Sequence, residues 1–276
     1  MYYVYDGSFE GFLSAMTVLF RNDDLRIDET NHETGVCRES QRMPLLPSVP
    51  VERIDGILDS FGTYLSRHFG ASMLDCIYRA FLSEISGVDN AIVDYISLAR
   101  KLRHNPIDML HIDCVKVVAE AAKRTIRETH RFTGLLRFRK LLPTSPSAVQ
   151  LSDHSNNLQS IGDNEIYYAE FEPDTDCLPL LAEHFIGRFA DRPFIIADRK
   201  RKRCLLHYSR SSWTIIDADS NFFKSLETDT IYEDLWRMYF KCLAIPDRIN
   251  PKLQAANMPK KYWKHLVEKP TSNCIL

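Results

Sequence analysis

The sequence lacks the short motifs by which common enzyme classes are recognised. It contains no glycine-rich phosphate loop, no G-x-S-x-G and no H-E-x-x-H. Only 10 of the 276 residues are glycine, which disfavours the tight backbone turns that cradle nucleotides. The chain therefore offers no simple assignment to the P-loop, α/β-hydrolase or zinc-protease classes.

Other absences concern the compartment and the cofactors. The seven cysteines are odd in number and form no C-x-x-C, which disfavours a disulfide framework and a zinc knuckle. No run approaches the roughly 18 to 20 apolar residues of a membrane helix, and the start MYYVYDGSFEG lacks the basic region of a signal peptide. The nine histidines show no ligand-like spacing. We expect a cytoplasmic protein with no membrane contact, no metal and no cofactor.

The charge is unevenly distributed, although the net charge is only -2. Three segments are strongly basic: residues 123–140 carry +6, 199–203 carry +5, and 247–269 carry +4. The remainder must then be about -17 to reach the total of -2. Because basic residues gathered on one surface attract phosphates, the average does not exclude a nucleic-acid partner. We expect the three segments to converge on one surface.

Periodicity predicts an α+β protein: a helical N-terminal half, then a small, mainly antiparallel sheet with flanking helices and an irregular C-terminal tail. In the first half we expect a strand at 2–5, a helix from Ser8, and a connector over 21–50 with room for one short strand. Further helices are predicted over 51–70, 71–85, 89–103 and from Pro106 to about 128.

The second half changes period. We expect strands at 132–142, 166–172, 194–197, 204–208 and 213–216, the last three forming an antiparallel meander. Helices are predicted over 177–190, capped by Asp174 or Asp176, and over 229–243. Residues 143–163 are polar and rich in turn residues, which predicts a mobile insertion. The domain prediction is an N-terminal region 1–85, a domain 86–268 and a disordered tail 269–276.

Three groups of basic residues are candidate nucleic-acid contacts. On a strand, Arg137 and Arg139 would share one face and present guanidinium groups to phosphates; pairing with Glu170 or Glu172 is the equally weighted alternative. The nearby Arg131 belongs to the same group. The second group is the hairpin tip Arg199, Lys200, Arg201, Lys202 and Arg203, where few acids are expected close by. A merely solvated turn is the other interpretation of this run.

The third group interleaves basic and aromatic residues in Met258-Pro-Lys-Lys-Tyr-Trp-Lys-His-Leu266. Here Lys260, Lys261 and Lys264 could contact phosphates while Tyr262 and Trp263 stack on bases. The alternative is that the two aromatics anchor the tail to the core.

Acidic residues provide the only catalytic candidates. Glu170, Asp174 and Asp198 could serve a hydrolase that acts on damaged DNA, with Tyr168 or Trp213 stacking on an extruded base. For Asp174 and Asp176 the alternatives are helix capping and metal binding.

Several blocks together carry a resemblance to a known family. The stretches YVYDGSFEGFL, VDNAIVDYISLARKL, HRFTGLLRFRKL, YYAEFEPDTDCLPLLAEHFIGRF, EDLWRMYF and MPKKYWKHL resemble a bacterial family assigned to DNA metabolism or repair. The region from about 86 to 268 resembles a domain of unknown function that also occurs fused behind uracil-DNA glycosylase-like domains. Members of this family are typically encoded beside a radical-SAM protein.

The resemblance implies a pathway and no established reaction. Our leading hypothesis is an accessory protein that binds DNA and acts in repair with the radical-SAM enzyme. The alternatives are a glycosylase-like or nuclease-like hydrolase, and an adaptor whose helical first half docks the partner. The chain itself has no cysteine triad for an iron–sulfur cluster, so it is not the radical-SAM component.

Overall fold

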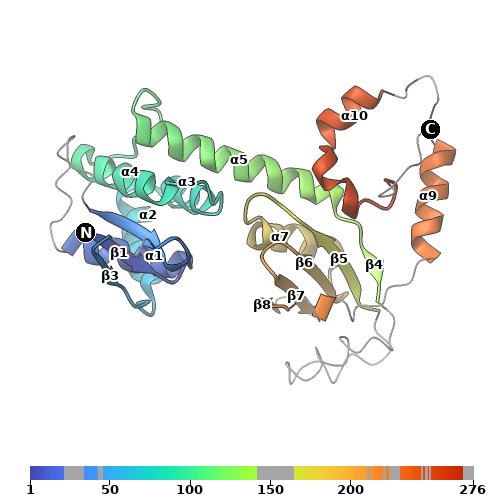
Figure 1. Ribbon diagram of the computed structural model, residues 1–276, viewed down its shortest axis with the longest axis horizontal. Coiled ribbons are helices and arrows are strands. Elements are labelled where there is room, and N and C mark those ends of the chain that lie inside the picture. Colours follow the sequence, from blue (N-terminus) through green and yellow to red (C-terminus); the bar gives the residue numbers. More distant parts are fainter. Residues whose placement is uncertain are drawn as a thin grey trace. The chain divides into compact units, whose positions relative to one another are not determined.

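The structure is a computed structural model that describes residues 1–21, 34–42, 46–141, 165–209, 212–219, 222–223, 231–243, 245, 248 and 250–269 (Figure 1). The chain forms two compact units, Met1–Arg127 and Glu128–Leu276, and each is described separately below. The α+β prediction is confirmed. The predicted insertion 143–163 lies outside the described residues, as do residues 270–276 of the predicted tail.

The first unit contains a three-stranded parallel sheet with β1 in the centre. Its elements are β1 (Tyr2–Tyr5), β2 (Gly35–Arg38) and β3 (Ser48–Pro50), with α1 (Phe9–Arg21) following the first strand. The predicted cap is present, because the Ser8 Oγ accepts the N–H of Gly11 at 2.9 Å. Gly7 has φ +90°, a left-handed conformation that suits glycine in the turn before the helix.

The predicted connector over 21–50 holds two strands, one more than expected. Strands of three or four residues are too short to show a period of two, and these two form only because β1 offers both of its edges for pairing. The missed parallel arrangement therefore depends on tertiary pairing and carries no local signal.

Helices make up the rest of the first unit. They are a π-helical turn η2 (Leu58–Gly62), α2 (Thr63–Phe69), α3 (Ala71–Phe81), α4 (Val88–Leu102) and the first part of α5 (Asp113–Leu135). The prediction that Pro106 opens the long helix is wrong, since α5 begins at Asp113. Asn105 explains the delay: its Oδ1 accepts the N–H of Ile107 and the hydroxyl of Tyr95, which fixes a turn at Pro106.

A buried ion pair joins the sheet of this unit to α4. Arg38 at the end of β2 donates from Nε and Nη2 to the two carboxylate oxygens of Asp89, both at 3.0 Å. The Tyr5 hydroxyl donates to the same carboxylate at 2.8 Å, and Arg38 lies 4.5 Å from the ring centre of Phe81. With both charges nine-tenths buried, the pair fixes β2 and α4 together.

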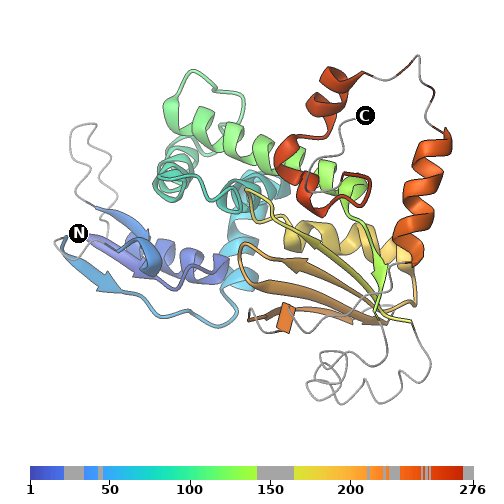
Figure 2. The ribbon, with the colours of Figure 1, turned by 45° about the vertical axis from the view of Figure 1, so that its right-hand side comes forward.

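The second unit is built on a five-stranded sheet in the order β4-β5-β6-β7-β8 (Figure 2). Its strands are β4 (Arg139–Lys140), β5 (Tyr167–Phe171), β6 (Phe194–Asp198), β7 (Arg203–Ser209) and β8 (Ser212–Asp217). The predicted antiparallel meander is confirmed in β6, β7 and β8. Only the β5–β6 pairing is parallel, so the carboxyl ends of these two strands meet at the same edge.

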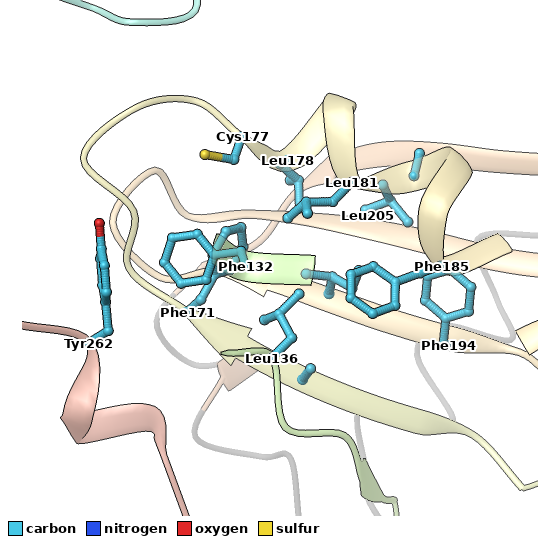
Figure 3. Packing of buried hydrophobic residues seen from close by; sticks show 13 residues of the cluster. Phe132, Leu136, Phe171, Cys177, Leu178, Leu181, Phe185, Phe194, Leu205 and Tyr262 are labelled. Carbon is cyan, nitrogen blue, oxygen red and sulfur yellow. The ribbon is translucent and has the colours of Figure 1, made fainter. Parts of the chain in front are cut away.

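Helix α7 (Leu178–Phe189) packs on one face of this sheet over an apolar core. Figure 3 shows Phe132, Phe171 and Leu178 within that core, with Tyr262 entering beside the first two rings from the C-terminal segment. The predicted capping by Asp174 or Asp176 is wrong. The cap position is Cys177, which makes no side-chain capping bond.

The predicted strand at 132–142 begins as helix and contains only a short strand. Helix α5 continues to Leu135, and β4 contains only Arg139 and Lys140. Phe132 and Leu136 are four residues apart and both bury their side chains in the core below α7, which is the spacing of a helical face. Arg137 lies on the connection, so it does not share a strand face with Arg139.

The last described segments are more regular than predicted. After α9 (Ile231–Leu243) come α10 (Pro251–Asn257) and a 3-10 helix, η5 (Lys260–His265). Asn250 caps α10 by accepting the N–H of Leu253 at 3.0 Å, with Pro251 in the first turn. Pro251 thus begins a helix within the C-terminal region that the sequence predicts to be irregular. No helix in the described part of the chain is long and apolar enough to cross a membrane.

Candidate nucleic-acid interface

The three basic segments come together near the carboxyl ends of β5 and β6. Arg199, Lys200, Arg201 and Lys202 form the turn between β6 and β7, and Arg203 begins β7. The Lys260–His265 segment is η5, which lies against the end of β5. Arg139 enters from β4, directly opposite Tyr168 of β5.

Glu170 is the residue at which all three segments meet. Its carboxylate lies 3.9 Å from Arg139 Nη1, 3.4 Å from Arg199 Nη1 and 3.5 Å from His265 Nδ1. The Tyr168 hydroxyl donates to it at 3.1 Å. Convergence of the basic segments is therefore real, but it takes place around an acid.

The environment of Glu170 keeps it ionised. Burial by itself raises the pKa of this carboxyl, but hydrogen bonding and charge from His265, the charge of Arg199 and the bond from Tyr168 outweigh it and lower the pKa to about 2. Since a carboxyl with such a pKa holds no proton at neutral pH, Glu170 suits the role of a charge partner and not that of a general acid.

A second carboxylate, Glu128 in the C-terminal half of α5, organises the loop after β5. It accepts the backbone N–H groups of Asp174 and Thr175 at 3.0 and 2.7 Å, and also the hydroxyl of Tyr262. Burial raises the pKa of Glu128, but the bonds from Tyr262 and the two backbone donors outweigh it and the net shift is downward. The loop and η5 are therefore fixed by one buried acid.

The turn between β6 and β7 is built around Asp198. This side chain is wholly buried and accepts the N–H groups of Lys200 and Arg201 at 3.0 and 3.1 Å. Arg201 also pairs with it through Nη1 at 2.9 Å and reaches back to the carbonyl of Asp174. Burial raises the pKa of Asp198, and Arg201 opposes that rise. These side-chain contacts of Asp198 all hold the turn.

Two further arginines are committed to acids. Arg137 pairs with Glu268 at 2.5 Å, and the side chains are only 17% and 2% exposed. Arg203 pairs with Asp176, the last acid of the loop after β5. The expectation that few acids approach the basic hairpin tip is wrong. Because β5 and β6 are parallel, the acidic loop that follows β5 lies beside the turn that follows β6. The sequence alone does not show this, since the two segments are separated along the chain.

Four of the predicted contact residues have no carboxylate partner among the described residues: Arg131, Lys200, Lys202 and Lys260. All four are exposed. Lys200 bonds instead to the carbonyl oxygen of Asp174 at 3.0 Å, and Lys260 lies 5.9 Å from the ring centre of Trp263. These four positions are the ones that can meet a phosphate without first leaving an acid.

Lys261 and Lys264 form pairs that remain in contact with solvent. Lys261 pairs with Asp174, and Lys264 Nζ lies 2.6 Å from Glu172 Oε1. The neighbouring aromatics serve as anchors: Tyr262 is 3% exposed and packs against Phe132. In this conformation Tyr262 offers no free ring face to a base.

Comparison with known proteins gives one match. A family model described as a domain of unknown function, DUF4130, matches residues 86–268, which is more than half of the chain. The chain belongs to this family. No curated protein and no solved structure matches it.

The DUF4130 region contains the whole convergent site, together with part of the first unit. It begins at residue 86, two residues before α4, whereas the compact units divide at 127 and 128 within α5. The family boundary therefore keeps α4, and with it Asp89, inside the DUF4130 region.

The catalytic candidates of the DUF4130 region occupy different environments. Glu170 is ionised and lies beside Arg139, Arg199 and His265. Asp198 is buried within its turn, and Asp174 pairs with Lys261. Burial raises the pKa of Cys177, the residue after Asp176, to about 12, so this thiol is neutral at physiological pH. Tyr168 is buried, while Trp213 on β8 is 41% exposed. No group of His, Cys, Asp and Glu able to hold a metal occurs among the residues that the structure describes.

Three structural residues of the DUF4130 region were missed from the sequence: Glu128, His265 and Glu268. Each makes its bonds to residues distant in the chain, as in the contact between Glu268 and Arg137. The one signal was that Glu128 is the only acid within the basic segment 123–140. An isolated acid among cations suggests pairing, but it does not identify the partner.

Proposed function

We propose that this protein is a nucleic-acid-binding accessory factor in DNA repair or DNA metabolism, acting with a radical-SAM enzyme. The observation that supports it most directly is the meeting of two basic segments at one residue. Lys200 of the β6–β7 turn donates to the carbonyl of Asp174, and Lys261 of η5 pairs with its carboxylate. Segments 60 residues apart in sequence are thus held on the same loop.

Arg131, Lys200, Lys202 and Lys260 make the first phosphate contacts in this proposal. A lysine or arginine that meets a phosphate forms a charge-assisted bond and releases counterions from the nucleic acid. Buried pairs such as Arg137–Glu268 take no part, because breaking them would leave a charge buried without a partner.

Salt dependence of binding tests the proposal. Four phosphate contacts alone should make the logarithm of the affinity for duplex DNA fall with a slope of roughly -3 to -4 against the logarithm of salt concentration, and any further contact should make the slope steeper. The double variant Lys200→Gln/Lys202→Gln should reduce the magnitude of this slope by about 2.

A lysine on the first unit provides the control. Lys101→Gln removes an exposed charge from α4 and should leave the slope unchanged. If neither single- nor double-stranded DNA binds the full chain at low salt, the proposal is wrong.

An adaptor role is favoured by a separate observation on α9, which lies in the second unit and not in the helical first half where the sequence predicts docking. Leu235, Met238, Tyr239 and Leu243 are each more than half exposed. At spacings of three, four and eight residues they share one face of the helix. Such a face is typical of a site that packs against a protein partner, here the radical-SAM protein that the family resemblance implies.

A pull-down of the radical-SAM partner tests the adaptor role. Met238→Glu should abolish capture, while Lys252→Glu, which places the same residue on the exposed α10, should not. Equal capture by both variants would exclude the α9 face as the partner site. DNA binding by Met238→Glu should equal that of the wild type.

A further inference from the structure

We infer that Glu172 and Asp174 compete with nucleic-acid phosphates for Lys264 and Lys261, so that binding exchanges two carboxylate partners for two phosphates. This inference rests on the proposed function. It adds two acids, Glu172 and Asp174, that lower the affinity for nucleic acid. It also adds two phosphate-binding lysines that are paired with these acids in the free protein. The loop containing the acids thereby restrains binding.

Exposure divides the ion pairs of this region into two classes: arginine pairs such as Arg199–Glu170 and Arg203–Asp176, whose acid is at most 22% exposed, and lysine pairs in which both side chains are at least 35% exposed. Arg201 and Asp198 are 10% and 0% exposed, and neither can meet a large ligand. Lys261 and Asp174 are 46% and 42% exposed, and Lys264 and Glu172 are 50% and 35% exposed. Only the second class can exchange partners at the protein surface.

The exposed pairs are also easy to separate. Ion pairs in contact with solvent contribute little to stability, because water screens the charges and two long side chains lose freedom when they pair. A phosphate offers the same ammonium group several acceptor oxygens and a counterion release that a carboxylate does not supply. The exchange therefore favours the phosphate at low salt.

Neither lysine is needed where it now lies. Glu128 is 3.9 Å from Lys261, but it already accepts three hydrogen bonds, from Asp174, Thr175 and Tyr262. The main-chain bonds of the loop thus stay intact when Lys261 leaves. On the other side of the loop, His265 Nε2 lies 3.6 Å from Glu172 Oε1, so an imidazole remains beside that acid after Lys264 departs.

The two exchanging pairs lie next to lysines that are expected to meet phosphates first. Lys260, which has no carboxylate partner in the described part of the chain, is adjacent to Lys261 in η5, and Lys200 also contacts Asp174. A strand bound by the unpaired lysines would pass directly beside the two exchanging pairs. The acids would then repel it until their lysines turn toward it.

Neutralising the acids tests the exchange in the full chain. Asp174→Asn and Glu172→Gln should each tighten binding of a fluorescent DNA oligonucleotide by about two- to fivefold, the range that corresponds to loss of one exposed pair. Lys261→Gln should weaken binding. In the double variant Asp174→Asn/Lys261→Gln the gain from Asp174→Asn should disappear, because it acts by releasing Lys261.

Glu165→Gln is the matched control. Glu165 is an exposed acid paired with Lys140 at 2.6 Å, just before β5 begins, so its replacement makes the same change in net charge away from η5. It should alter affinity by less than about 1.5-fold. If Asp174→Asn and Glu172→Gln behave like Glu165→Gln while the wild type binds DNA, the exchange is wrong and the proposed function stands. If neither the wild type nor any variant binds DNA, the proposed function and the exchange are both wrong.

Discussion

At the scale of single residues, buried carboxylates organise this protein. Asp89 joins β2 to α4, Glu128 holds the loop after β5, Asp198 shapes the β6–β7 turn and Glu170 gathers three basic segments. Each accepts bonds from residues that are distant in sequence or from backbone groups. An exposed acid such as Asp75 makes only local contacts and has no comparable role.

Loss of Asp89 should strongly destabilise the first unit. Asp89→Ala leaves the buried guanidinium of Arg38 without a counter-charge and the Tyr5 hydroxyl without an acceptor, which should cost about 3–5 kcal/mol of unfolding free energy. Urea denaturation measures the loss. Asp75→Ala breaks the exposed pair with Arg79 on α3 and should cost about 0.5 kcal/mol or less. Equal losses would show that the buried pair is not important for stability.

The depressed pKa of Glu170 should make stability depend on pH. Because the folded-state value of about 2 lies below the ordinary 4.5, ionised Glu170 stabilises the fold above about pH 4.5. That contribution is lost as the pH falls through 4.5 toward 2. Glu170→Gln should therefore be less stable than the wild type at pH 7, with the difference vanishing near pH 2. Chemical denaturation of both proteins between pH 7 and pH 2 measures this difference in stability. A difference that does not change with pH would contradict the prediction.

Sequence patterns predicted which residue types gather here, but not how they pair. The basic segments and the acidic loop around Asp174 were both visible, and pairing of the arginines with Glu170 was one of the alternatives. The partners Glu268 and Glu233 were not foreseen, because Arg137 and Arg139 reach them across more than 90 residues. Long-range pairing depends on the sheet order, which no local pattern contains.

At the scale of elements, the turn between β6 and β7 combines strain with charge. Lys202 has φ +53°, a left-handed conformation that costs a residue with a side chain about 1 kcal/mol. The turn keeps this geometry because Asp198 binds the N–H groups of Lys200 and Arg201. The sequence predicted the turn and its strands correctly, but not the acid that fixes it.

Replacing Lys202 with glycine should separate these two properties. Lys202→Gly removes the strain and should raise the unfolding free energy by up to about 1 kcal/mol, while it weakens DNA binding by removing a phosphate contact. The same change at Lys200, whose φ is not positive, should give no gain in stability. Thermal unfolding and a DNA titration measure the two effects. A gain at both positions would show that strain at Lys202 is not its cause.

Periodicity succeeded where an element buries a long face and failed where an element depends on another. It predicted α1, α4, α7 and the meander, each with a continuous apolar pattern. It missed β2 and β3, which exist by pairing with β1, and it took the end of α5 for a strand. In the last case Phe132 and Leu136 follow helical spacing, but the arginines around them suggested alternation.

At the scale of the whole molecule, many basic residues of the second unit are paired with acids. The basic segments do not form one uncompensated positive surface, since five of their arginines lie against acids: Arg137 against Glu268, Arg139 and Arg199 against Glu170, Arg201 against Asp198, and Arg203 against Asp176. The basic segments, although separate from the acids along the chain, are thus partly neutralised in the folded protein. Binding to nucleic acid then depends on the few cations that remain unpaired or can exchange.

The limits of the compact units predict which N-terminal fragment of the chain can fold by itself. The sequence placed a boundary after residue 85, whereas the compact units divide at 127 and 128. A fragment ending at 85 loses α4, and with it Asp89 and the side-chain oxygen of Asn90, which accepts the N–H of Val36 at 2.9 Å. Arg38 would remain without its counter-charge. We therefore expect fragment 1–85 to show no cooperative unfolding transition, and fragment 1–127 to show one.

Circular dichroism during heating and limited proteolysis would distinguish the two fragments. Fragment 1–127 retains α4 and the buried residues Val115 and Val118 of α5, so it keeps the apolar contacts of its own unit. Asp89→Ala in this fragment should reproduce the loss expected in the full chain, because the pair with Arg38 lies wholly within it. A cooperative transition in fragment 1–85 would instead place the folding boundary before α4, at the start of the DUF4130 region.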